Sequence, residues 1–479
     1  MFKKKTNTTE QEEQGIIYSE NIQIPISKGE NNNALIIESN DSEVQQKYIE
    51  SNLSQADNSY VIVGSPEISA SKIQYEIEES GRHIQILDLS GYVGIATVQY
   101  NPLKHIDKHC HTEKDVEKIV DCIMCNSLCD SNGRNCHLNT LELRLEKALI
   151  SSLILYLIEI SDNDICRLDT ALLMIKLANI SSKRVCCGIN GFSLDNLLDE
   201  VFSGLKKISC RQYRDDKILD CNDVEDKKQY EYQDLLLTSS CLKQYQLFKC
   251  CSIETQKKKV LASATMRLSI FAGVYSIPQE QCKYDVVNDE VDVSRLDEVD
   301  INSLRKQGNC LLATYSEANE ATKVLTAILI SQICDSLTRE PYESRQEAHV
   351  KFIVDGIDNA CLIPELKHKL TSCQNFNMSF DILLPSITIA EAIYNDWNYI
   401  SQAFNVYVCF DAIDEHTAEY FSQRMKNNIK NQYAFPKNQY AADCIQKILD
   451  KDEIMMLPDY ACLVIVNKAG QCIDKKKWC

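Results

Sequence analysis

Residues 33–45 read Asn33-Ala-Leu-Ile-Ile-Glu-Ser-Asn-Asp-Ser-Glu-Val-Gln45, an apolar run followed by a polar turn and the start of a helical pattern. A short apolar run before a turn and a helix is typical of a strand in a parallel sheet, because such strands are buried on both faces. Further apolar runs at 59–63 and 83–87 repeat the same rhythm. Together they predict an α/β fold, with a parallel sheet flanked by helices.

The sheet pattern is interrupted in the middle of the chain and then resumes. From residue 112 to residue 271, apolar residues recur at helical spacing, which predicts an all-helical inserted domain. Strand-like runs return at 310–315, 350–355, 380–384, 406–410 and 462–466. We therefore predict a mobile tail at 1–14, a first sheet part at 15–109, the helical domain at 110–272 and a second sheet part at 273–479.

The turn after the first strand is where a phosphate-binding loop lies in folds of this kind. A working loop reads Gly-x-x-x-x-Gly-Lys-Ser/Thr, in which glycines let backbone N–H groups approach phosphate, lysine supplies charge and the hydroxyl binds magnesium. The corresponding residues here are Glu38, Ser39, Asn40, Asp41, Ser42, Glu43, Val44 and Gln45. Three of them are carboxylates that repel a triphosphate, and none is a lysine that attracts it. We therefore expect no bound cofactor, neither ATP nor magnesium.

A second candidate element is the apolar strand 351–354, which delivers Asp355 at its end, where a magnesium-directing aspartate belongs. The next residue is Gly356, which lacks the carboxylate that would polarise an attacking water. Asp358 would share the face of Asp355 if the strand continued, but an aspartate in a turn is the simpler interpretation.

Several sequence blocks resemble, in order and spacing, the TraG-type (TraG/TraD-like) coupling proteins of type IV secretion systems. These blocks are 33–64, Gln99-Tyr-Asn-Pro-Leu103, 258–271, 350–384, Asp396-Trp397, Val406-Tyr-Val-Cys-Phe410, Asp414-Glu-His-Thr-Ala-Glu-Tyr420 and 456–466. They cover most of the chain. The resemblance implies a RecA-like fold with an inserted helical domain. It also implies a motor that hexamerises beneath a secretion channel, binds ATP between subunits and moves relaxase-bound single-stranded DNA.

The chain departs from the family pattern at the positions that serve ATP. The family's loop lysine and threonine, its catalytic glutamate, two arginines and a strand-ending glutamine are all replaced. The replacements are, in that order, Val44, Gln45, Gly356, Gln374, Phe376 and Pro385. Among these nucleotide-site positions Asp355 alone keeps the family residue. Phosphoryl transfer depends on such charged groups, so their joint loss predicts loss of hydrolysis.

These departures predict a pseudo-ATPase, a catalytically degenerate relative of the coupling ATPase of conjugative DNA transfer. It would act as a non-hydrolysing subunit, an adaptor or a regulator. Its expected partners are another copy of itself or an intact coupling ATPase, together with relaxase or single-stranded DNA. Two alternatives stay open, which are an active DNA-translocating ATPase with an unusual nucleotide site and a Cys/His metal-binding protein.

The metal alternative depends on cysteines and histidines clustered between residues 109 and 137. Cys122, Cys125, Cys136 and His137 are the best zinc ligands in this cluster by spacing. However, Cys122, Cys125 and Cys129 also fall at i, i+3 and i+7 of one apolar helix face, where cysteine acts as a small core residue. Since the 23 cysteines are scattered along the chain, we expect core thiols and no metal.

The composition fits an ordered globular protein, with 44% hydrophobic and 25% charged residues. The net charge of -18 repels nucleic acid and anionic lipid, so any contact with DNA must be local. We see no signal peptide and no apolar stretch of the roughly 20 residues needed to cross a bilayer. The expected location is the cytoplasm, with the protein at most peripheral to a membrane secretion channel, and the thiols are expected to be reduced.

Overall fold

The structure is a computed structural model of the 479-residue chain. It describes residues 15–27, 29–38, 42–53, 58–64, 73, 75, 82–91, 96–107, 111–127, 139–160, 166–181, 195–203, 240–272, 274, 283–284, 291–292, 296–306, 308–316, 318–339, 348–355, 362–431, 448–467 and 469–476. The tail predicted at 1–14 lies outside these residues. The chain forms two compact units, the first made of 1–99, 297–319 and 333–479, and the second of 100–296 and 320–332. The boundaries predicted at 109 and 272 stay predictions.

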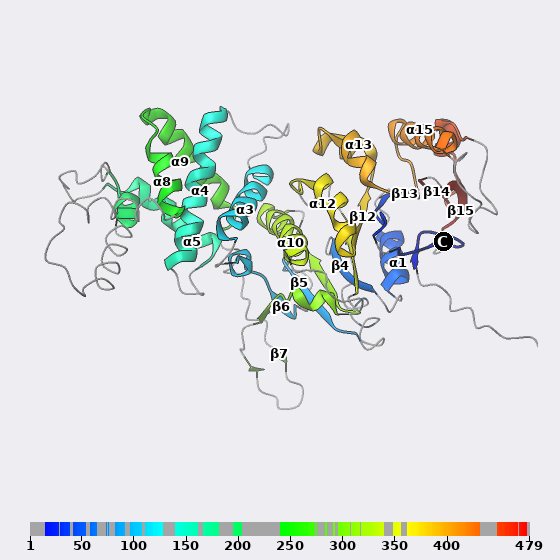
Figure 1. Cartoon of the computed structure of the whole chain (residues 1–479), viewed down its shortest axis with the longest axis horizontal. Coiled ribbons are helices and arrows are strands. Elements are labelled where there is room, and N and C mark those ends of the chain that lie inside the picture. The colour runs from blue at the N-terminus through cyan, green and yellow to red at the C-terminus, as the bar shows by residue number, and fades with distance from the viewer. Residues whose placement is uncertain are drawn as a thin grey trace, which may run out of the picture. The chain divides into compact units, whose positions relative to one another are not determined.

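The first unit contains a nine-stranded sheet in the order β15-β14-β13-β3-β12-β11-β4-β10-β5 (Figure 1). Its strands are β3 (Ala34–Ile37), β4 (Asn58–Gly64), β5 (Ile84–Asp88), β10 (Cys310–Thr314), β11 (His349–Val354), β12 (Met378–Leu384), β13 (Val406–Cys409), β14 (Ala461–Val466) and β15 (Gly470–Lys475). From β13 to β5 all neighbours are parallel, whereas β14 pairs antiparallel with both β13 and β15. The predicted α/β fold with a parallel sheet is confirmed.

The strand order places late parts of the chain at the centre of the sheet. After β3 the chain passes through α1 (Ser42–Leu53) to β4, yet β12 and β11 lie between β3 and β4. In parallel sheets ligands bind outside the carboxyl ends of the strands, where the order reverses. The ends of β3, β12 and β11 therefore mark the edge at which a nucleotide site would lie.

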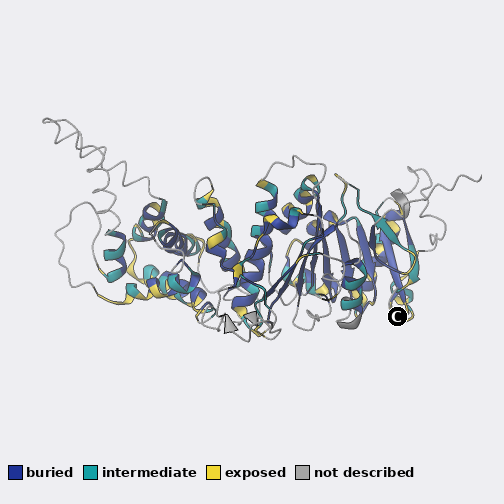
Figure 2. Ribbon diagram, turned by 90° about the horizontal axis from the view of Figure 1, so that it is seen from below, coloured by how far each residue is buried: buried dark blue, intermediate teal, exposed yellow. Residues whose placement is uncertain are grey.

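The strands from β13 to β10 are buried along their whole length because both faces of the sheet are covered, whereas the edge strand β15 is partly exposed. Figure 2 shows them almost entirely in the buried colour. On one face, Ile36, Ile353 and Leu383 from the central strands pack in one cluster with Tyr48 and Ile49 of α1. Buried parallel strands carry continuous apolar runs instead of alternating ones, which is the pattern seen in the sequence.

The first unit also contains smaller helices and two pairs of short strands. These are α12 (Leu366–Cys373), α13 (Ile387–Ile393), α14 (Trp397–Ile400), α15 (Glu415–Asn431), α16 (Lys451–Met455), the antiparallel pair β1 (Gly15–Ile17) and β2 (Gln23–Pro25), and the parallel pair β6 (Val98–Gln99) and β9 (Asp297–Glu298). The β1–β2 pair is tied to α1 by the Asn52 side chain, which accepts from Ile17 N at 2.9 Å and donates to Ile17 O at 3.1 Å.

The second unit is mainly helical in its described residues. Its helices are α3 (Thr112–Asn126), α4 (Thr140–Ile160), α5 (Leu168–Lys176), α8 (Ser240–Lys249), α9 (Glu254–Ser269) and the first part of α10 (Glu320–Arg339). Arg267 of α9 joins three of them. Its Nε donates to Glu146 of α4 at 2.9 Å, and its Nη1 donates to the carbonyls of Met124 and Ser127 at the end of α3. Across the described residues, no helix combines the length and the apolar character needed to cross a membrane.

Candidate nucleotide site

The carboxyl edge of the sheet brings together residues that follow β3, β12 and β11. Glu38 follows β3, and its backbone N donates to Leu384 O at the end of β12 at 3.0 Å. Asp355 follows β11, and its backbone N donates to Val63 O of β4 at 2.9 Å. The side chains of Glu38 and Asp355 are buried. The edge thus presents two buried carboxyl groups, one on either side of β12.

The predicted phosphate turn is described in part. Ser39, Asn40 and Asp41 lie outside the described residues, as do the side chains of Ser42, Glu43 and Gln45. Helix α1 begins at Ser42. Val44, which stands where the loop lysine would be, is 7% exposed and belongs to the core cluster between α1 and the sheet. At the lysine position the chain therefore places an apolar side chain that packs inward.

The other predicted site residues divide between the two ends of β12. Pro385 follows the strand at the carboxyl edge and is buried. Gln374 and Phe376 form the short helical turn before the strand, at its amino end, and are half-buried. The Phe376 carbonyl accepts a hydrogen bond from Arg305 Nη1 at 2.8 Å. The structure therefore places Pro385 at the same edge of the sheet as Glu38 and Asp355, and Gln374 and Phe376 at the opposite edge. Gly356 and Asp358 lie outside the described residues.

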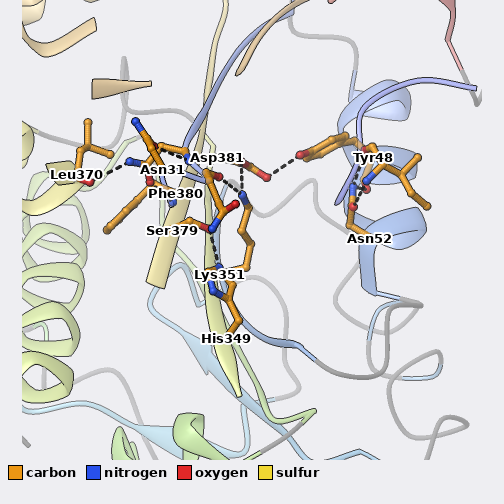
Figure 3. A network of polar contacts seen from close by, with 12 residues as sticks. Asn31, Tyr48, Asn52, His349, Lys351, Leu370, Ser379, Phe380 and Asp381 are labelled. Carbon is orange, nitrogen blue, oxygen red and sulfur yellow. Dashed lines mark hydrogen bonds and ion pairs between the residues drawn. The ribbon is translucent and has the colours of Figure 1, made fainter. Parts of the chain in front are cut away.

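A buried polar network beneath this edge was missed by the sequence analysis (Figure 3). Lys351 of β11 and Asp381 of β12 are completely enclosed, and Lys351 Nζ lies 2.6 Å from Asp381 Oδ1. Lys351 Nζ also donates to Asn32 O at 2.9 Å, and Tyr48 of α1 donates its hydroxyl to Asp381 Oδ2 at 2.7 Å. In the sequence, the signal for this network is one charged residue inside each of the two apolar strand runs that form β11 and β12.

Burial governs the protonation of this network. Burial raises the pKa of the Asp381 carboxyl above its ordinary value, although Lys351 and the Tyr48 hydrogen bond oppose the rise. Burial likewise lowers the pKa of the Lys351 ammonium, and Asp381 opposes that fall. Each charge is therefore tolerated in the sheet only because the other is in contact with it.

His349 extends the polar network toward the amino end of β11. Its Nε2 lies 2.7 Å from Ser379 Oγ and its Nδ1 lies 3.1 Å from Asn377 Oδ1. Figure 3 shows His349, Lys351, Ser379 and Asp381 gathered on the two neighbouring strands. Lys351 is the only other basic side chain in strand β11, and it is held inside the sheet, away from the strand ends.

The predicted metal ligands are described only in part, since Cys136 and His137 lie outside the described residues. Cys122 is buried on α3, with its Sγ 3.8 Å from Ser331 Oγ. Cys125 is exposed. The prediction that Cys125 shares the apolar face with Cys122 is therefore wrong. The buried face of α3 is formed by residues such as Val116 and Ile123, and Cys125 lies on the other side of the helix.

The purified protein is expected to contain well under one zinc per chain after dialysis, with its thiols reduced. Within the described residues, no group of three or more His, Cys, Asp or Glu side chains is placed to hold a metal ion. Elemental analysis measures the zinc, and thiol titration of the denatured protein measures the cysteines. About one zinc per chain that survives dialysis, and is lost in Cys122→Ser, would contradict the core-thiol interpretation.

Comparison with known proteins relates the chain to coupling proteins. Residues 349–459 match the family model described as the TraM recognition site of TraD and TraG. A trigonal form of the bacterial conjugative coupling protein TrwBdeltaN70, in complex with sulphate, is similar with a TM-score of 0.56 at 11% identity, over 96% of this chain and 89% of that chain.

Two further solved structures resemble the chain more weakly. TrwB in complex with ADP and Mg2+ gives a TM-score of 0.49 at 11% identity, over 88% of this chain and 86% of that chain. VirB4 of Thermoanaerobacter pseudethanolicus gives 0.43 at 10% identity, over 97% and 96%. No curated protein matches the chain by sequence. The matched segment and the strand order confirm the resemblance: residues 349–459 are similar to TraD and TraG, and the chain has a RecA-like fold similar to that of TrwB.

Proposed function

We propose that the chain is a non-hydrolysing relative of the conjugative coupling ATPases, acting as a subunit, adaptor or regulator of DNA transfer. One observation carries the proposal, namely that Val44 fills the lysine position and packs in the apolar core. A lysine there would face the phosphates of a bound nucleotide. The chain keeps the helix that follows the phosphate turn, but Val44 in the first turn of this helix packs in the core.

The electrostatic consequence is large. Two unit charges about 4 Å apart near a protein surface interact by roughly 4 kcal/mol. Loss of the lysine alone would therefore weaken phosphate binding by about a thousandfold. Glu38 adds a buried carboxyl group at the start of the same turn, and a carboxylate at this position would repel a polyanion. These terms support the absence of ATP and magnesium as working cofactors.

The proposed role lies in assembly with other components of conjugation. Residues 349–459 match the TraM recognition site of TraD and TraG, which supports a partner among the proteins that prepare DNA for transfer. Self-association or association with an intact coupling ATPase would place the chain at the cytoplasmic side of a secretion channel. Relaxase or single-stranded DNA would then reach it as cargo.

Magnesium-ATP is expected to bind no tighter than about millimolar and not to be hydrolysed. Titration calorimetry measures the binding, and phosphate release measures the turnover. Asp355→Ala is the matched variant, because it removes the retained aspartate and should leave the background rate unchanged. Micromolar binding, with magnesium-dependent turnover that Asp355→Ala abolishes, would replace this proposal by the second one.

The second proposal is an active DNA-translocating ATPase with an unusual nucleotide site. Asp355 favours it, because this aspartate stands at the end of β11, beside β12, where the magnesium-directing aspartate of a motor ATPase belongs. In that case the missing cation would have to come from another part of the chain or from a neighbouring subunit.

A further inference from the structure

The outer edge of the nine-stranded sheet, at β15, carries backbone groups that point away from the sheet. Strand β15 lies at the end of the strand order, and among the described strands it pairs with β14 alone (Figure 1). Next to this pair, Lys476 N donates to Tyr460 O at 2.8 Å. The direction of the backbone groups alternates along an antiparallel strand. The N–H and C=O groups of Gln471, Ile473 and Lys475 therefore point outward.

One end of this edge is closed by the chain itself. Glu20 N donates to Lys475 O at 2.9 Å, which confirms that the Lys475 carbonyl points outward. The residues on either side of Glu20 bind the Asp474 side chain. Within the described part of the chain, no hydrogen bond reaches the outward groups of Gln471 and Ile473. The centre of the edge is therefore unpaired.

The Gln471 side chain is a further unpaired polar group at this edge. It belongs to a residue that is 2% exposed, and neither its Nε2 nor its Oε1 has a hydrogen-bond partner among the described residues. Buried polar groups in folded proteins are nearly always hydrogen-bonded, because an unpaired one has lost water without compensation. An amide in this state indicates a partner that a single copy of the chain does not supply.

The centre of the edge also lacks the features that keep sheet edges apart. Proteins protect such edges with charged side chains, prolines or bulges. Residues 471–473 read Gln-Cys-Ile, without charge or proline, and the register with β14 runs without a bulge from Gly470 to Lys475. The charged side chains of the strand, Asp474 and Lys475, stand at the end that Glu20 closes.

We propose that β15 pairs antiparallel with β15 of a second copy of the chain, about a two-fold axis at Cys472. In this register Gln471 lies opposite Ile473 of the second copy, and Ile473 lies opposite Gln471 of that copy. Each unpaired N–H then meets an unpaired C=O, so the outward backbone groups of both residues are all bonded. The Lys475 carbonyl is not needed, which leaves its bond from Glu20 intact.

The side chains of β15 fit this pairing. Asp474 lies opposite Gly470 of the second copy, so no like charge and no bulky side chain opposes the carboxylate. The two Gln471 side chains lie on one face as diagonal neighbours about 7–8 Å apart, so each amide can donate to the other. A strand of another protein would need its own polar group there, whereas a second copy carries it. Because each copy offers one such edge, the pairing closes at a dimer.

The oligomeric state of the full chain tests the pairing. Light scattering at about 50 µM chain is expected to give the mass of a dimer, and Ile473→Pro is expected to give that of a monomer. Proline removes only the outward N–H of this residue, so the bonds from β15 to β14 stay in place. The circular dichroism spectrum and the urea midpoint check that the variant is folded. Ile473→Val is the matched control, since it keeps the N–H and should remain a dimer.

Cross-linking of the native chain tests the register without any change of the backbone. The axis sets Cys472 opposite Cys472 of the second copy, in a non-hydrogen-bonded pair with Cα atoms about 4.5 Å apart, which a disulfide can bridge. Diamide oxidises the two thiols to a disulfide and takes up their hydrogens. We expect a covalent dimer on a non-reducing gel. Cys472→Ser should lose it, whereas Cys250→Ser, which removes an exposed thiol, should keep it.

Several outcomes would overturn the inference. These are a native chain that is monomeric at this concentration, a dimer that a folded Ile473→Pro variant leaves intact, and a covalent dimer that Cys472→Ser keeps. If Ile473→Pro does not fold, the cross-link decides alone. An assembly that grows beyond two copies would assign the association to another surface.

The inference rests on the self-association within the proposed function, for which it names the surface. ATP binding measured on the same samples separates the two. A monomer that binds no ATP would overturn this inference alone, whereas an intact dimer that binds and hydrolyses ATP would overturn the proposed function alone.

Discussion

Lys351→Met is expected to lower the free energy of unfolding of the first unit by about 3–5 kcal/mol. The substitution keeps an unbranched side chain of similar length but leaves the Asp381 carboxyl in the sheet without its ion pair. An unpaired buried charge must either be desolvated alone or take up a proton. Tyr48, which donates to the same carboxyl, supplies one hydrogen bond but no compensating charge.

Urea denaturation followed by tryptophan fluorescence measures this loss, because Trp397, one of the two tryptophans, is buried in the first unit. The double variant Lys351→Met/Asp381→Leu should recover part of the stability, since an apolar pair replaces the ion pair but the hydrogen bonds to the Asn32 carbonyl and from the Tyr48 hydroxyl are still lost. Lys451→Met, which breaks the exposed contact with Glu415, is the matched control and should leave the midpoint unchanged. A single Lys351→Met variant as stable as the control would show that the ion pair contributes nothing.

Arg267→Met is expected to destabilise the second unit by a similar amount, about 3–5 kcal/mol. Arg267 and Glu146 are buried, and the same guanidinium also satisfies the Met124 and Ser127 carbonyls. Burial raises the pKa of Glu146, while Arg267 opposes the rise. Removing the guanidinium thus leaves a buried carboxyl group and two helix-end carbonyls without this donor.

Native-state hydrogen exchange of α3, α4 and α9 measures this effect, because the three helices meet at Arg267. As for the first pair, Arg267→Met/Glu146→Leu should recover only part of the loss, since the two carbonyls stay without the guanidinium. Arg167→Met, which breaks the part-exposed pair of Arg167 with Asp169, serves as the control. Exchange rates in Arg267→Met equal to those of the control would contradict the conclusion that Arg267 holds these three helices together.

The sequence predicts the strands of the sheet well, but not their order. The apolar runs at 34–37, 59–63 and 350–354 are strands because burial on both faces demands uninterrupted apolar residues. The insertion of β12 and β11 between β3 and β4 leaves no local signal, since it depends on contacts between residues hundreds of positions apart.

The candidate site shows the same division between local and distant information. The replacement of lysine by Val44 is visible in the sequence, whereas its packing in the core depends on the sheet beneath α1. Lys351 and Asp381 are each visible in the sequence only as one charged residue inside an apolar run. Their pairing follows from the register that sets Lys351 against Ser379 and Ile353 against Asp381, on one face of adjacent strands.

The position of β12 in the sheet has a consequence for synthesis of the protein on the ribosome. β3 and β4 emerge early, but their central neighbours emerge only when the chain has reached residue 384. The inner edge of β4 lacks its partner β11 until residue 354, and that of β3 lacks β12 until residue 384, so both expose unpaired backbone groups that are templates for pairing with other chains. Residues 100–296 of the helical unit are complete well before that point and can fold locally. A nascent chain arrested before β12 is therefore a species that needs chaperone protection.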